Sequence, residues 1–187
     1  MKRILIIILI TLIYSQTTQI EDFINEVLAG NPELAEKAIS SLITDYPNNP
    51  KVMYLQGLLE MNGETAKEHF KAVHEKHPNS NYSDDSVMKV AEYYYAAGYY
   101  IQSSDWLQKM PLYYPRSPYI ERAIKLFLNS LIVSGSKDTA IFYSKVFKKR
   151  FPKMDIDNKV PDVLNDYEST NNGIKKEQIK DSFQEFI

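Results

Sequence analysis

The chain has 187 residues, of which 44% are hydrophobic and 25% are charged, a balance typical of soluble globular proteins that argues against wholesale disorder. Its formal net charge of −2 leaves no excess positive charge for binding nucleic acid. Because the chain contains no cysteine, disulfides, thiolate metal ligands, a cysteine nucleophile and a lipid-modified cysteine are all excluded.

The first element in chain order is a short apolar segment at the amino terminus. Lys2 and Arg3 precede a largely apolar run over residues 4–14, and Ser15 follows it. A basic head, an apolar stretch and a small residue are typical of a secretory signal peptide, which we expect over residues 1–15 with cleavage near Ser15. A spanning helix needs about 20 apolar residues, so we expect an exported protein without a transmembrane anchor after cleavage.

Amphipathic stretches separated by short turns follow the signal segment, with apolar residues at the spacing of one helix face. The sequence predicts helices over residues 19–29, 32–46, 51–61, 64–77, 83–97, 100–110, 118–134 and 137–151.

Prolines mark a repeat in this series of helices. Pro47, Pro78, Pro115 and Pro152 are separated by 31, 37 and 37 residues, and each follows an amphipathic stretch. Proline cannot continue the hydrogen-bond ladder of a helix and disfavours helix just before itself. We therefore expect each of these prolines to end the second helix of a hairpin, whereas Pro111 is expected to stop the third hairpin a few residues early.

Glycines recur at the expected turns inside the hairpins. Gly30, Gly98 and Gly135 each stand seventeen residues before one of the prolines, where a left-handed backbone closes the first helix. In the remaining unit we expect the pair 62–63 (Asn-Gly) to have the same role. Small residues stand twelve positions before each proline, where the two helices of a hairpin approach closely: Ala35, Ala66, Ser103 and Ala140.

Two kinds of motif connect this pattern to a known family. Val90-Ala91-x-x-Tyr94 and Phe127-Leu128-x-x-Leu131 match the first-helix stretch of a tetratricopeptide repeat. The segments 78–82 and 115–119 both read Pro-x-Ser-x-Tyr and lengthen the repeat to 37 residues. The chain thus resembles a tetratricopeptide-repeat protein over residues 20–152, and in particular the envelope repeats of the BamD and YbgF families.

This resemblance implies an all-α fold in which residues 16–152 form a right-handed superhelix of about four helical hairpins. It also implies a periplasmic, non-enzymatic adaptor, with association with the outer membrane as the alternative location. The expected partner is a protein or peptide segment, such as an envelope protein involved in assembly or division.

The resemblance further places the partner-binding surface on the first helices of the hairpins, along the concave groove. An extended or helical peptide with an acidic end suits the aromatic, apolar and basic side chains there. Carried over position by position, the groove residues are Lys51, Tyr54, Leu58, Met61, Asp85, Met88, Glu92, Tyr95, Arg122, Lys125, Asn129 and Ile132.

The repeat pattern ends at Pro152. Residues 153–173 are rich in Asp and Asn and are expected to form a linker, and 174–187 form a weakly amphipathic stretch that predicts a capping helix. If that helix undocks, the exposed terminal face permits an alternative function as a self-assembling structural protein that stacks end to end.

The sequence contains few motifs that are typical of catalysis or cofactor binding, and we expect neither an enzyme nor a cofactor. Nucleophile elbows, phosphate-binding loops and His-Glu-x-x-His motifs are absent from it. His69, His74 and His77 cluster in one helix and leave an enzyme or metal carrier as a third hypothesis, but the simpler interpretation is a solvated helix face. The pair 84–85 (Asp-Asp) fits the start of a helix, where acids favour the dipole.

Overall fold

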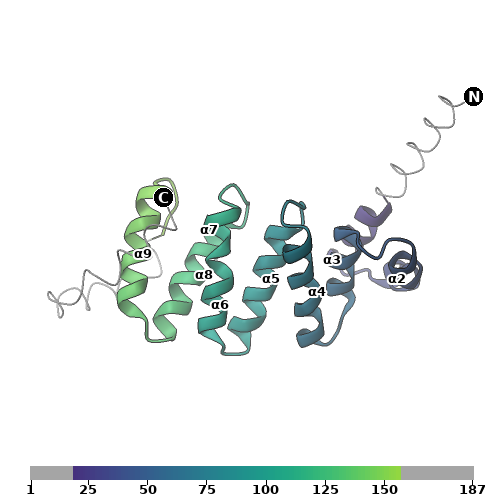
Figure 1. Cartoon of the computed structure of the whole chain (residues 1–187), viewed down its shortest axis with the longest axis horizontal. Helices are drawn as coiled ribbons and strands as arrows, with labels where there is room; N and C mark the ends of the chain where they lie inside the picture. The colour runs from purple at the N-terminus through teal and green to yellow at the C-terminus, as the bar shows by residue number, and fades with distance from the viewer. Residues whose placement is uncertain (1–18, 157–187) are drawn as a thin grey trace, which may run out of the picture. The chain divides into compact units, whose positions relative to one another are not determined.

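The computed structural model describes residues 19–156, which form helices joined by turns, with no strand in that range (Figure 1). The predicted all-α fold is therefore confirmed for these residues. The signal segment 1–15 and the capping segment 174–187 lie outside the described residues, as does most of the predicted linker. None of the helices within 19–156 is long and apolar enough to cross a bilayer.

The helices follow the predicted series closely. Residues 19–28 are helical. The helices after them are α2 (Glu33–Asp45), α3 (Pro50–Leu59), α4 (Gly63–Lys76), α5 (Ser83–Ala96), α6 (Tyr100–Leu107), α7 (Lys109–Tyr113), α8 (Ile120–Val133) and α9 (Lys137–Arg150). The chain divides into two compact units, here called unit one (described residues 19–86) and unit two (87–156), and the division falls inside α5.

Unit one is built around the hairpin of α3 and α4 (Figure 1). Helix α3 begins with Pro50 at its first position, where the missing N–H costs nothing, and the Asn49 side chain accepts a hydrogen bond of 2.9 Å from the Lys51 amide. Val52 and Val73 are both fully buried, one on each helix. Apolar burial of this kind supplies most of the stability of such a hairpin, at about 25 cal/mol per Å².

Unit two has a continuous core in which α8 packs against α6, α7 and α9 (Figure 1). The Phe127 ring of α8 lies edge-on to the Tyr143 and Phe147 rings of α9, with centroids 5.0 and 5.8 Å away. Ser103 of α6 is fully buried and its hydroxyl donates a hydrogen bond of 2.9 Å to the carbonyl of Ala91 in α5. A larger side chain at position 103 would keep these two backbones apart.

The predicted small residues and turn glycines are confirmed. Ala35, Ala66, Ser103 and Ala140 are all buried. Gly30, Gly98 and Gly135 have φ angles of 92°, 81° and 87°, the left-handed conformation that closes the first helix of a hairpin.

The expected role of Asn62 and Gly63 is wrong. Helix α3 ends at Leu59, and the next residue, Glu60, has an extended backbone conformation. The turn between α3 and α4 therefore needs no residue in the left-handed conformation. Asn62 instead begins α4, because its side-chain oxygen accepts hydrogen bonds from the amides of Glu64 (3.0 Å) and Thr65 (3.1 Å).

The expected stop at Pro111 is also wrong. The helix is interrupted earlier, at Gln108, and resumes as α7, which continues past Pro111 to Tyr113. Pro111 is the third residue of α7, and the first-turn amides of a helix have no intrahelical acceptor. The proline is therefore tolerated there, and its ring is buried.

Candidate partner-binding surface

In unit one, polar pairs join the predicted groove residues to neighbouring elements. The Lys51 ammonium of α3 lies 2.6 Å from a carboxylate oxygen of Glu21, which belongs to the helical stretch 19–28. The Tyr54 hydroxyl of α3 donates a hydrogen bond to the Asp85 carboxylate at the start of α5. Hydrogen bonds and ion pairs thus connect α3 to the helical stretch before it and to the start of α5.

Tyr54 itself is not available on a surface, which corrects its place among the groove residues. Only 1% of the residue is exposed, because its ring packs against Phe70 (centroids 5.5 Å apart) and Tyr82 (4.9 Å). Burial raises the pKa of Tyr82 above its ordinary value of 10.0, and the nearby Glu21 carboxylate adds to the rise. Tyr54 therefore holds α3 against its neighbours, with Asp85 satisfying its hydroxyl.

The remaining unit-one positions differ in exposure. Leu58 is half-buried on α3. Met61 is 99% exposed, but it follows the last residue of α3 and lies in the turn before α4. Its expected place on the helix face is wrong because α3 ends at Leu59, two residues earlier than predicted.

In unit two, the first helices of neighbouring hairpins, α5 and α8, are joined by two polar pairs. The Arg122 guanidinium lies 2.6 Å from the Glu92 carboxylate, and the Asn129 side-chain amide donates a hydrogen bond of 2.6 Å to the Tyr95 hydroxyl. The Arg122 side chain remains 68% exposed. Asn129 is also exposed, and Tyr95 is half-buried with its ring edge-on to Tyr100, 5.2 Å away.

Three further predicted residues belong to unit two. Lys125 pairs with Glu121 one turn earlier in α8, at 2.6 Å, and its side chain is 31% exposed. Ile132 is half-buried and packs against the core. Met88 is 2% exposed and belongs to the core that α5 and α8 share, so its expected place on an open groove is corrected.

The arrangement that remains in unit two is a polar surface on α5 and α8. We call Glu92, Tyr95, Arg122, Lys125 and Asn129 the α5–α8 surface. It carries both charges and an aromatic ring, and its hydrogen-bonding groups reach solvent at Arg122 and Asn129. Such a set can recognise polar and charged groups of a partner, whereas it contains no activated nucleophile paired with a base.

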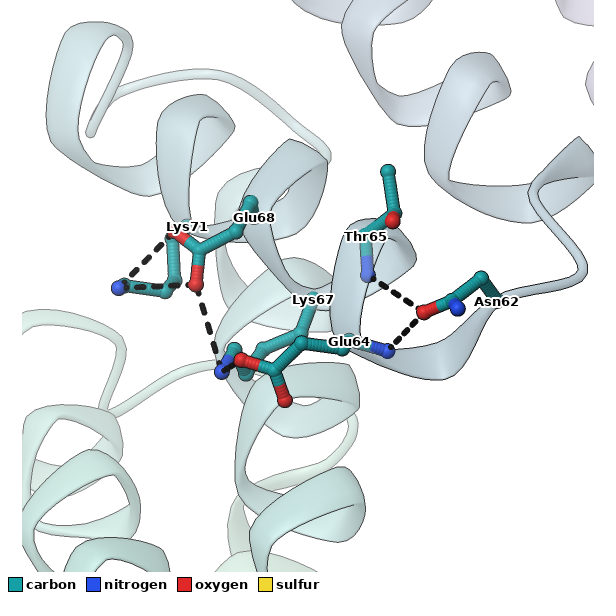
Figure 2. Close-up of polar contacts among 6 residues, drawn as sticks. All are labelled: Asn62, Glu64, Thr65, Lys67, Glu68 and Lys71. Atoms are coloured by element: carbon teal, nitrogen blue, oxygen red, sulfur yellow. Dashed lines mark hydrogen bonds and ion pairs between the residues drawn. The ribbon is translucent and has the colours of Figure 1, made fainter.

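A buried lysine in α4 was not predicted from the sequence. Lys67 is 5% exposed, and its ammonium contacts the carboxylates of Glu64 and, at 3.3 Å, Glu68 (Figure 2). Lys71 lies 3.1 Å from Glu68, and its hydrogen bond is the largest cause of a lowered pKa at that carboxyl. A buried lysine is often a reactive group, but here two carboxylates compensate its charge, which favours a structural role.

Glu21 and Glu121 are the contacting residues that sequence reasoning missed. A signal for Glu21 existed: it precedes Lys51 by 30 residues, Tyr54 precedes Asp85 by 31, and Asn129 follows Tyr95 by 34. Polar pairs separated by 30 to 34 residues join successive first helices at these places. The partner of Lys125 was visible as an i, i+4 pair on one helix.

The three histidines do not gather a metal site among the described residues. Within 19–156, no group of three or more histidine or carboxylate side chains could hold a metal ion together.

Comparison with protein-family models finds no matching family, and comparison with curated proteins finds no relative.

Proposed function

We propose that this protein is an exported, non-enzymatic scaffold of tetratricopeptide-like hairpins that binds a segment of another protein on the first helices of its repeats. The observation that carries the proposal is the α5–α8 surface, where Arg122 and Asn129 are exposed although each contacts the neighbouring helix. The repeat pattern in the sequence assigns both positions to the groove.

The electrostatics of this surface favour a ligand with a carboxylate. An ion pair as exposed as that of Arg122 with Glu92 contributes about 0–1 kcal/mol. A carboxylate of the ligand can replace or share the Glu92 contact at little cost, and the planar guanidinium can hold it with two hydrogen bonds. An acidic residue or chain terminus of the partner is therefore proposed to lie at Arg122.

Side chains of the α5–α8 surface that are already held in place by their neighbours are the physical basis of the proposed binding. Tyr95 is held by Tyr100 and Asn129, and Lys125 by Glu121, so these side chains lose little conformational freedom when a partner arrives. The entropy cost then falls mainly on the ligand. The amino-terminal signal pattern supports an envelope location, and the repeat motifs support a role in envelope assembly or division.

Photocrosslinking in the native host tests the proposal. A photoreactive benzoylphenylalanine replaces Arg122 or Asn129 in separate variants, and Gln102 or Asp105 in the controls, which are exposed positions on α6. We expect a defined protein product from positions 122 and 129, reduced by Tyr95→Ala in the same chain, and none from the controls. Identical products from both sets, or no product from α8, would contradict the proposal.

A further inference from the structure

The strongest concentration of positive charge in the chain surrounds α9. Residues 137–153 contain six basic residues and one acidic residue, a net charge of +5, although the whole chain carries −2 and the remainder therefore −7. The exposed cations form what we call the basic face: Lys145, Lys148, Lys149, Arg150 and Lys153.

The helix dipole explains only part of this cluster. Lys148, Lys149 and Arg150 occupy the last turn of α9, where cations interact favourably with the carbonyl end. Lys145 lies before that turn and Lys153 lies beyond the helix end.

Spacing places several of these cations together. Lys145 stands three residues before Lys148 and four before Lys149, so it neighbours each of them on the helix surface. On the next flank, the Arg150 guanidinium lies 5.6 Å from the centre of the Phe151 ring. The basic face therefore continues around the end of α9.

Apolar side chains accompany the cations. Phe142 and Val146 are half-buried and stand three residues before Lys145 and Lys149, respectively. Cations beside partly exposed apolar groups match the boundary of a lipid bilayer, where phosphates lie next to the first acyl carbons. A nucleic acid would engage the cations but would gain nothing from Val146.

We propose that the basic face of α9 docks on the surface of a membrane containing anionic phospholipids. Clusters of four to eight Lys and Arg residues bind such surfaces, with each cation near the surface contributing to the attraction. The acidic remainder of the chain disfavours wrapping by a polyanion, whereas a flat bilayer contacts one face alone. This docking is independent of the α5–α8 surface, and either proposal can fail alone.

Vesicle sedimentation with the full chain tests the inference. The vesicles contain either phosphatidylcholine alone or equal parts of phosphatidylcholine and phosphatidylglycerol. We expect binding to the anionic vesicles, suppression by high salt, and roughly tenfold or greater weakening in the Lys145→Gln, Lys148→Gln, Lys149→Gln variant.

A charge-matched control variant separates the effect of removing cations from the basic face from the effect of lowering the net charge of the chain. Lys37→Gln, Lys76→Gln, Arg116→Gln removes three exposed cations from other helices and turns, and we expect it to bind nearly as the parent chain does. Circular dichroism checks that both variants stay folded. Equal loss in the two variants, equal binding to neutral vesicles, or displacement from anionic vesicles by duplex DNA at equimolar phosphate would overturn the inference.

Discussion

At the scale of single residues, Gly57 shows how closely the α3–α4 hairpin is packed. A Cβ built on Gly57 would lie 2.7 Å from Cε1 of Phe70, well inside normal contact distance. The Phe70 ring has little freedom to move away, because it is 6% exposed and packs against Tyr54. The close approach of α4 therefore favours glycine at position 57. The backbone conformation does not, because Gly57 has no positive φ angle.

We predict that Gly57→Ala lowers the free energy of unfolding by about 1–2 kcal/mol. Alanine is the better helix former by about 1 kcal/mol, so a net loss reports the steric conflict. Urea denaturation measures the change. In a double-mutant cycle, Gly57→Ala should cost less in the Phe70→Leu background, where the ring is gone. Strict additivity, or a stabilising Gly57→Ala, would show that the ring moves aside freely.

Two of the predicted groove residues were placed wrongly because neighbouring side chains bury them. Tyr54 and Met88 were placed on the groove by repeat position, and the structure buries both. The position of a residue in the repeat determines on which side of the helix it lies. Whether that residue is buried depends on the side chains of other elements that pack over that side. The Phe70 and Tyr82 rings cover Tyr54, and Met88 is enclosed in the core of unit two; neither kind of burial follows from spacing along the chain.

At the scale of elements, the start of α4 is defined by one side chain. The Asn62 oxygen accepts hydrogen bonds from two amides that would otherwise lack acceptors. We predict that Asn62→Ala lowers the free energy of unfolding by about 1 kcal/mol, and that Asn62→Asp retains most of the stability because its carboxylate makes the same bonds. Thermal and urea unfolding compare the three proteins. If the alanine variant is as stable as the parent, the cap is not formed.

The ion pairs of α4 predict a pH dependence. The pKa of Glu68 is lowered in the folded chain from its ordinary value of 4.5, first by the Lys71 hydrogen bond and also by Lys67, against opposing desolvation (Figure 2). The stabilisation is therefore fully present above pH 4.5 and is lost as the pH falls through the lowered folded pKa. Because the side chain is 55% exposed, we expect only a few tenths of a kcal/mol.

Urea unfolding at neutral pH and below the glutamate pKa measures this effect. Glu68→Gln should reduce the acid sensitivity of the protein, whereas Glu75→Gln, an exposed control on the same helix, should leave it unchanged. Equal acid sensitivity of Glu68→Gln and the parent chain would mean that the pairs with Lys67 and Lys71 contribute nothing.

Elements were the most predictable level of the structure. The positions of Gly30, Gly98 and Gly135 determine where three hairpins turn, because few other residues adopt their positive φ angles at low cost. The break between α6 and α7 was placed wrongly because proline acts differently by position: Pro111 falls in a first turn, where its missing N–H has no consequence.

At the scale of the whole molecule, the described chain consists of two compact units of helical hairpins, and charge is distributed unevenly within it. The α5–α8 surface combines both signs of charge, whereas residues 137–153 carry a net +5. The two surfaces lie on different helices of unit two. We therefore propose that one chain binds a protein segment through α5 and α8 and an anionic bilayer through α9.

Binding of a partner by the α5–α8 surface is the proposal on which the function rests. Calorimetric titration of the crosslinked partner into the purified chain tests it, comparing Tyr95→Ala, Lys125→Glu with a matched control, Tyr113→Ala, Lys149→Glu, on α7 and α9. We predict at least about a tenfold loss of affinity in the first variant, with unchanged helical content and near-parent binding in the control. An unchanged affinity in the first variant, or an equal loss in both, would contradict the claim.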